Sequence, residues 1–229
     1  MALILCIETS QQEASVALSA AGKCVALEIC RIQKEQASFL QPAIQSLMRA
    51  AGYWFSQLDA VAVSEGPGSY TGLRVGMASA KGLCYALNKP LINISTLLCM
   101  ATATREAVQR DVEKSDYRIV PMIDARRNEV FTAVYDTELQ MLAPPFACIL
   151  HEDAFKNYGD KQLVFSGGGS VKWKSQCKQP DCFFPEVDFN ASCMATIAKE
   201  KFDRSEFMPV EVAVPFYLKE FQSTASLLK

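Results

Sequence analysis

The fold is decided at residues 64–76, which read SEGPGSYTGLRVG. An apolar run, LDAVAVS at residues 58–64, leads into this string and predicts a buried strand. A helix is expected to follow it as far as about Leu87, because Pro90 breaks the helical pattern. Glycines at a strand-to-helix turn either let a phosphate approach the backbone or permit a tight turn. Both alternatives stay open, since the string matches neither G-x-G-x-x-G nor a P-loop.

One side of the expected helix combines small residues four apart with an adjacent apolar stripe. The small residues are Gly72, Gly76 and Ala80, and the stripe is Leu73, Met77 and Cys84. Such a flat face lets a second helix approach closely, which offsets the roughly 1 kcal/mol that a glycine inside a helix costs. The spacing therefore predicts a helix-on-helix contact, and leaves open whether the second helix belongs to this chain or to a partner.

Residues before the string alternate between short strands and helices. Polar turns separate three apolar runs, at residues 3–7, 15–19 and 24–29, which predict antiparallel strands. A helix over about 40–51 follows, and the string itself is succeeded by a strand at 91–94 and a helix to about Val108, capped by Ser95 or Thr96. The order β-β-β-α-β-α-β-α indicates an α/β fold with a mixed sheet.

The polar stretch at residues 109–117 is a candidate linker between two subdomains, 1–108 and 109–229. The C-terminal segment of the second subdomain could pack back on the first. Further strands are expected at residues 119–123, 129–135 and 163–165, and a helix capped by Asn190 at 191–201. Pro144-Pro145 and the triple glycine at 167–169 are expected breaks. The chain thus predicts two α/β halves of similar length.

Composition excludes several classes of protein. The chain has 229 residues, of which 50% are hydrophobic and 21% charged, so it is long and apolar enough to bury a core. This excludes a disordered chain and a miniprotein scaffold. A net charge of −2 argues against binding tRNA or DNA unaided. The start, MALILCI, lacks a signal peptide, and no apolar run is long enough for a membrane span, so a cytoplasmic protein is expected.

The cysteines and the single histidine limit the available chemistry. Nine scattered cysteines without a C-x-x-C pattern are typical of reduced, packed thiols, and the pair nearest in sequence, Cys177 and Cys182, has no neighbouring histidine. His151 is the only histidine, so a histidine-pair metal centre is excluded. We expect no catalytic residue, no metal and no cofactor.

Two other turns could face a ligand. Glu8-Thr9-Ser10 ends the first strand, where it could position a metal–phosphate or merely cap a hairpin. Gly167 and Gly168 could approach a nucleotide, although a glycine run alone is a weak signal. The turn at residues 124–129, DARRNE, fits a solvated hairpin with mutually paired charges.

Five strings together resemble the TsaB family of tRNA threonylcarbamoyladenosine biosynthesis proteins. They are IETS at 7–10, SEGPGSYTGLRVG at 64–76, AKGL at 80–83, MIDAR at 122–126 and PFYL at 215–218. The resemblance extends over nearly the whole chain and is densest before Leu87. It implies an actin-like (ASKHA) fold of two related α/β subdomains with mixed sheets.

The resemblance also implies a function. TsaB-like proteins are non-catalytic, cytoplasmic partners of the paralogous transferase TsaD, which modifies the adenosine 3′ of the tRNA anticodon, and a small ATPase, TsaE, joins them. Pairing with TsaD uses helices that include residues 71–87, and the same surface can form a homodimer. The tRNA would then be contacted indirectly, and no membrane is involved.

For single residues, the resemblance implies that the helix face described above is the partner interface. It makes Glu8, Thr9, Ser10, Gly167 and Gly168 candidates for vestigial nucleotide loops. The alternative is a stand-alone ASKHA-type ATPase or kinase, or a glycoprotease-like peptidase. A peptidase would need an activated nucleophile or a metal-bound water, and an ATPase a carboxylate with two converging glycine loops. Glu8 and residues 167–169 are the only candidates for the latter.

Overall fold

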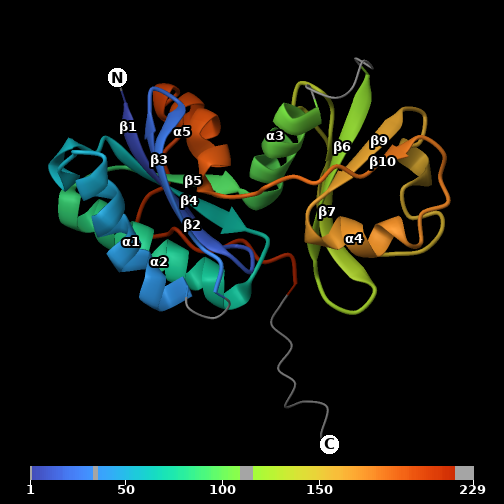
Figure 1. The fold of residues 1–229 in the computed structure, drawn as a ribbon, viewed down its shortest axis with the longest axis horizontal. Coiled ribbons are helices and arrows are strands. Elements are labelled where there is room, and N and C mark those ends of the chain that lie inside the picture. Colours follow the sequence, from blue (N-terminus) through green and yellow to red (C-terminus); the bar gives the residue numbers. More distant parts are fainter. Residues whose placement is uncertain (1, 33–35, 109–115, 220–229) are drawn as a thin grey trace, which may run out of the picture.

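The computed structural model describes residues 2–32, 36–108 and 116–219, which form two α/β subdomains side by side (Figure 1). The first contains a five-stranded sheet in the order β3-β2-β1-β4-β5. Its strands are β1 (Leu3–Glu8), β2 (Ala14–Ala20), β3 (Lys23–Cys30), β4 (Ala60–Gly66) and β5 (Leu91–Ser95). β1, β2 and β3 pair antiparallel, whereas β4 and β5 continue from β1 in parallel.

The second sheet repeats this topology. Its strands are β6 (Tyr117–Asp124), β7 (Glu129–Tyr135), β8 (Met141–Ile149), β9 (Gln162–Ser166) and β10 (Cys182–Phe183). They lie in the order β8-β7-β6-β9-β10, again with three antiparallel strands followed by two parallel ones. The expected α/β fold of two related subdomains with mixed sheets, of the actin-like type, is confirmed.

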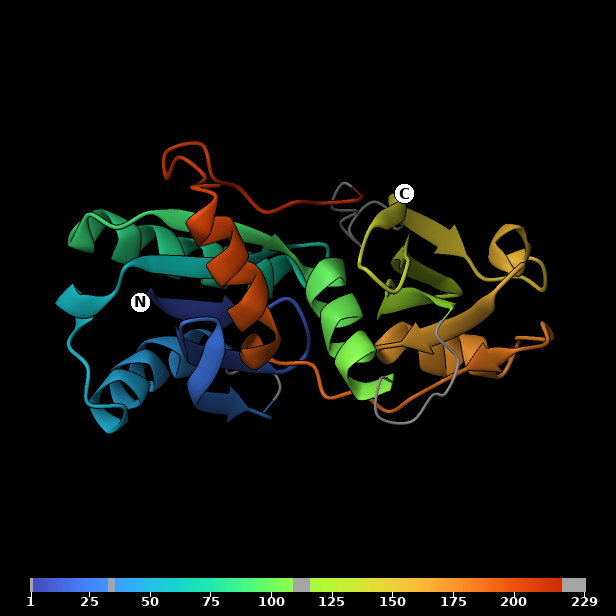
Figure 2. The ribbon, with the colours of Figure 1, turned by 90° about the horizontal axis from the view of Figure 1, so that it is seen from above.

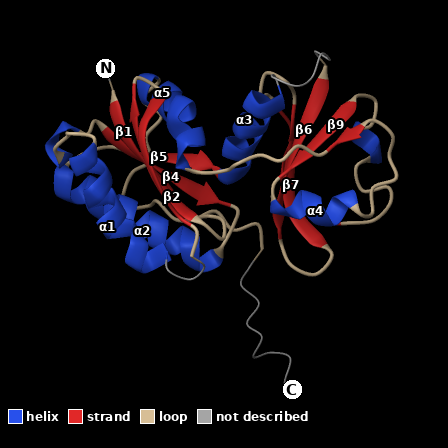
Figure 3. Cartoon of the chain, viewed as in Figure 1, coloured by secondary structure: helices blue, strands red, loops and turns tan. Residues whose placement is uncertain are grey.

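Helices cover both faces of the first sheet (Figure 3). On one face α1 (Gln36–Ala50) and α2 (Tyr70–Leu87) pack against the odd-numbered side chains of β1, such as Leu5 and Ile7. On the other, α3 (Thr96–Val108), α5 (Ala195–Asp203) and the 3-10 turn η3 (Ala191–Met194) face the even-numbered side chains, such as Cys6. Alternate side chains of a strand point to opposite sides, so β1, which has helices on both sides, is buried along its whole length, whereas the edge strand β3 is largely exposed.

Helix α3 is shared between the two subdomains. It also packs against β6 and β7, where Leu97 and Met100 join the core around Ile119. The opposite face of the second sheet is covered by α4 (Gly168–Lys174), whose Trp173 is fully buried. Two further 3-10 turns, η1 (Phe55–Gln57) and η2 (Lys156–Tyr158), complete the described elements.

The chain returns to the first subdomain at its C-terminal end, as the sequence had allowed. α5 packs on β1 and β5, and the segment after it runs across toward the second subdomain (Figure 2). On this path Met208 bridges to Leu91 of β5, and Lys219 forms an ion pair with Glu129 of β7. Within the described residues, no helix combines the length and the apolar composition that a membrane crossing requires.

Four expectations about the elements need correction or lie partly outside the structure. α1 begins at Gln36 rather than near Leu40. Pro144-Pro145 does not break the chain but lies inside β8, an edge strand, where a missing N–H can face outward. Helix α4 was not expected, because its seven residues are too short for a periodic pattern. Most of the candidate linker, residues 109–115, lies outside the described residues, and Tyr117 already begins β6.

The two tryptophans should differ sharply in their contribution to stability. Trp173 is fully buried, with its ring edge-on to Phe155 and Phe165 at centroid distances of 5.4 and 6.0 Å, whereas Trp54 is 79% exposed. We expect Trp173→Ala to lower the free energy of unfolding by about 3–5 kcal/mol and Trp54→Ala to change it by less than about 0.5 kcal/mol. Urea unfolding measures both. Equal effects of the two variants would contradict this packing.

Candidate partner-binding surface

The glycine-rich string forms the turn between β4 and α2, and its glycines contact the end of β1. Ser69 caps α2, because its side chain accepts a hydrogen bond from Gly72 N at 3.2 Å. A Cβ at Gly72 would overlap the carbonyl oxygen of Thr9, and a Cβ at Gly76 would overlap the Thr9 hydroxyl. Glycine is therefore required at both positions by the close approach of Thr9, through its backbone at Gly72 and through its side chain at Gly76.

Thr9 and Ser10 are each hydrogen-bonded to this turn. The Thr9 hydroxyl donates to Gly72 O at 2.8 Å, and Ser69 N donates to Ser10 O at 2.7 Å. Thr9 and Ser10 are both buried. Gly72 N and Leu73 N, in the first turn of α2, donate to the side chain and the carbonyl of Ser69, so part of the donor set that a phosphate would need is used within the chain. The structure thus brings the two loops together as a packed unit.

Glu8 is buried on the other face of β1, toward α3 and η3. One carboxyl oxygen accepts hydrogen bonds from the backbone N and the hydroxyl of Ser10, while Oε2 has no partner among the described residues. Burial raises the pKa of Glu8 from 4.5 to about 7, because desolvation disfavours the charged form; the hydrogen bonds from Ser10 and Ser64 only partly oppose this rise.

The second glycine turn has the equivalent place in the duplicated topology, between β9 and α4. Gly167 has a φ of +85°, and a Cβ there would lie 2.6 Å from Met122 O and overlap Met100 of α3. Gly168 has no atom within 4 Å of an added Cβ. α3 stands between this turn and Glu8, with Cys99 in the core of the first subdomain and Met100 against Gly167. The structure does not bring the two candidate nucleotide loops together.

The six residues expected to form the partner interface are buried inside the first subdomain. They are Gly72, Leu73, Gly76, Met77, Ala80 and Cys84. This side of α2 packs against β4, against helix α1 of the same chain and against the end of β1, and Gly72 and Gly76 of the small-residue row approach Thr9 most closely. The assignment of these residues to a partner surface was wrong, because the apolar stripe beside them marks the core-facing side of the helix.

A second small-residue row lies on the outer side of α2, at Ala78, Gly82 and Ala86. An added Cβ at Gly82 would meet nothing within 4 Å, and Tyr85 beside it is 86% exposed. Ala78 and Gly82, together with Gln41 of α1, line a hollow of about 420 Å³ between the two helices. The four-residue spacing of this outer row can be seen in the sequence, but no adjacent apolar stripe draws attention to it.

We define the outer α1–α2 face by the exposed residues of these two helices. On α1 they are Ala37, Ser38, Gln41, Pro42, Gln45, Ser46, Arg49 and Ala50, and on α2 they are Thr71, Arg74, Ala78, Gly82, Tyr85 and Ala86. Neither helix contains an Asp or Glu. The face therefore combines low charge, small side chains and one prominent aromatic ring, which are properties of a surface that a helical partner can approach closely.

The PFYL string closes over the turn that begins α2. Phe216 N donates to Glu65 O at 2.7 Å, and a Cβ at Gly66 would overlap Phe216 O. The ring of Tyr217 packs against that of Tyr70 in a tilted arrangement with centroids 5.0 Å apart, and the Tyr217 hydroxyl accepts a hydrogen bond from Arg74 Nε at 3.1 Å. The string thus stabilises the start of α2, a role that the sequence did not indicate.

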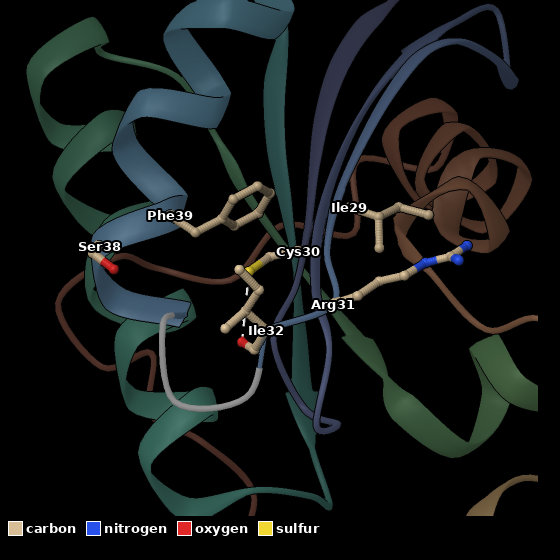
Figure 4. A pocket seen from close by; sticks show the side chains of 6 residues that line it. All are labelled: Ile29, Cys30, Arg31, Ile32, Ser38 and Phe39. Carbon is tan, nitrogen blue, oxygen red and sulfur yellow. Dashed lines mark hydrogen bonds between the residues drawn. The ribbon is translucent and has the colours of Figure 1, made fainter.

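A separate hollow of about 510 Å³ lies between the end of β3 and the start of α1 (Figure 4). Phe39 points toward Cys30 and Ile32, while Arg31 points away to the other side of β3. None of the site residues expected from the sequence lines it. Among the described residues, no three His, Cys, Asp or Glu side chains gather as metal ligands would.

The raised pKa of Glu8 predicts a specific pH dependence of stability. A carboxyl whose pKa is higher in the folded chain than in the unfolded chain stabilises the fold below about pH 4.5, and this stabilisation is lost as the pH rises through about 7. The full loss is about 3 kcal/mol. We expect Glu8→Gln to lack this decline in urea unfolding between pH 5 and 8, whereas Glu138→Gln, at an exposed carboxylate, retains it. Parallel curves for Glu8→Gln and the wild type would contradict the prediction.

Comparison with known proteins agrees with this fold. A model of the family tRNA N6-adenosine threonylcarbamoyltransferase, TsaD, matches residues 31–147. The tRNA threonylcarbamoyladenosine biosynthesis protein TsaB of Escherichia coli K12 is 29% identical over 94% of each chain, and that of Haemophilus influenzae is 36% identical over 56% of this chain and 51% of its own.

Two solved structures from Pseudomonas aeruginosa superpose over nearly the whole chain. A protein described as similar to the peptidase YEAZ has a TM-score of 0.81 and 26% identity, covering 96% of this chain and 100% of its own. The protein YeaZ has a TM-score of 0.76 and 25% identity, covering 95% and 100%. The chain belongs to the TsaD family, and within that family it is similar to the TsaB proteins over nearly its full length.

Proposed function

We propose that this chain is the TsaB-type subunit required for threonylcarbamoyladenosine formation in tRNA, supporting a TsaD transferase together with a TsaE-type ATPase. The single observation that carries the proposal is the match with a TsaB protein along 94% of both chains. It agrees with the fold, in which the Thr9 hydroxyl of one candidate nucleotide loop is used in a hydrogen bond to Gly72 O. The tRNA would be bound mainly by the partner, consistent with the net charge of −2. Because we propose that the protein shares the function of the TsaB proteins, we also place it in the cytoplasm.

The proposed role is non-catalytic. An ATPase would need a carboxylate free to face Mg-ATP, yet Glu8 is 1% exposed and bonded to Ser10. His151, the only histidine, is exposed in a turn outside the helices and strands. We infer that the turns at Glu8-Thr9-Ser10 and at Gly167-Gly168 are remnants of nucleotide loops in a duplicated fold, and that they now stabilise the chain itself.

We propose that TsaD pairs with the outer α1–α2 face. The small row at Ala78 and Gly82 would let a partner helix approach, and the exposed ring of Tyr85 would supply the kind of aromatic contact that often dominates binding energy. The same face could pair two copies of this chain when TsaD is absent. In this proposal residues 1–108 form the partner-binding subdomain, on which η3 and α5 pack from the C-terminal part, and the remainder of residues 109–229 forms the second subdomain.

Gly82→Arg tests the surface. Because an added Cβ at Gly82 meets nothing within 4 Å, the variant should keep its fold, and replacing a mid-helix glycine favours the helix by up to about 1 kcal/mol. It should nevertheless lower the affinity for TsaD at least about tenfold by holding the helices apart. The matched control is Val171→Arg, which adds the same side chain at an exposed position of α4. Calorimetric titration with TsaD measures both, and equal affinities would place the interface elsewhere.

The function itself is tested in cells depleted of their own TsaB. We expect the wild-type chain and Val171→Arg to restore threonylcarbamoyladenosine in digested tRNA, measured by nucleoside mass spectrometry, and Gly82→Arg to restore markedly less. Normal levels of the nucleoside in uncomplemented depleted cells, or no restoration by the wild-type chain, would overturn the proposed function.

A further inference from the structure

Two thiols meet at the edge of the second subdomain, in a region that the proposed function does not use. Cys177 Sγ donates a hydrogen bond to Cys182 Sγ at 3.5 Å. Among the described residues, this is the one hydrogen bond that joins two sulfur atoms. Both side chains are half-buried against the core that contains Trp173, so the pair is in contact yet reachable from solvent.

The backbone holds both cysteines in place while the turn between them is exposed. Cys177 N donates to Trp173 O at 2.8 Å, just beyond α4, and Leu163 N donates to Asp181 O at 3.2 Å, next to β10. Lys178, Pro180 and Asp181 in the intervening turn are exposed. A disulfide requires the sulfurs to move from 3.5 Å to about 2.05 Å. An exposed turn can absorb that movement without disturbing either anchor.

We propose that Cys177 and Cys182 form a reversible oxidation site, at which a peroxide converts the two thiols into an intramolecular disulfide. The reduced thiols are the expected resting state in a reducing compartment, and the disulfide would join the end of α4 to β10.

The reaction balances with hydrogen peroxide as the oxidant. The Cys177 thiolate attacks one peroxide oxygen, the O–O bond breaks and hydroxide leaves, giving a sulfenic acid. Cys182 then attacks the oxidised sulfur, the S–S bond forms and the S–O bond breaks, and the Cys182 proton leaves with the departing oxygen as water. The two sulfurs lose two electrons and the peroxide gains them. We assign the first attack to Cys177, because burial and the contact with Cys177 raise the pKa of Cys182 to about 12.

Trypsin can locate the bond, because Lys178 lies between the two cysteines. Cleavage yields one peptide of residues 175–178 and another of 179–199, which stay joined only through a disulfide. The second peptide also contains Cys193, which could react in place of Cys182. Cys193→Ser removes this ambiguity and leaves the proposed pair intact.

The experiment treats the reduced full chain with hydrogen peroxide, blocks free thiols and maps peptides without reduction. We expect a mass loss of about 2 Da and the linked peptides in the wild type and in Cys193→Ser, none in Cys177→Ser or Cys182→Ser, and reversal by dithiothreitol. Circular dichroism verifies that each variant is folded, and fragmentation of the wild-type linked peptide identifies its cysteines directly. Linkage through Cys193, linkage that persists in Cys182→Ser, or oxidation confined to the exposed Cys24 would overturn the proposal.

Discussion

The contact between Thr9 and the glycine row of α2 is the constraint on which the first subdomain depends. The Thr9 hydroxyl donates to Gly72 O, and no side chain larger than hydrogen fits at Gly72 or Gly76. Because this contact holds α2 against β1 and β4, it determines which side of the helix is buried. The other side, with Gly82 and Tyr85, is left facing solvent.

The duplicated topology shows how two similar halves have diverged. β1 and β6 have equivalent places, and each ends in an acid, Glu8 or Asp124. Glu8 is buried and bonded to its own loop, whereas Asp124 lies near solvent and pairs with Lys172 of α4. The first half has the long helix α1 between its third and fourth strands, where the second has only η2. Among the described residues, a broad helical surface is therefore present on the first subdomain alone.

Much of the fold could be predicted from the sequence, because continuous apolar runs and strings such as SEGPGSYTG are local signals. Such signals predict strands β1, β4 and β6 and helix α2, which begins after residue 69. β8 could not be predicted, because Pro144-Pro145 is typical of a break unless the strand is known to lie at a sheet edge. The partner surface was assigned to the wrong side of α2, because a row of glycines has the same spacing whether it accommodates a neighbouring helix or the backbone of the same chain. The apolar stripe beside the row and the contact with Thr9, more than sixty residues away in sequence, together identify this side as the core-facing one.

The central claim is that α2 uses one face for the core and presents the other to TsaD. The most direct measurement replaces Tyr85, or Val171 of α4 as the control, with a photo-crosslinking benzoylphenylalanine and irradiates the chain mixed with TsaD. Both positions are exposed, so neither replacement should disturb the fold. The account predicts a covalent adduct with TsaD from position 85 and none from position 171. Adducts from position 171 with none from position 85 would contradict it.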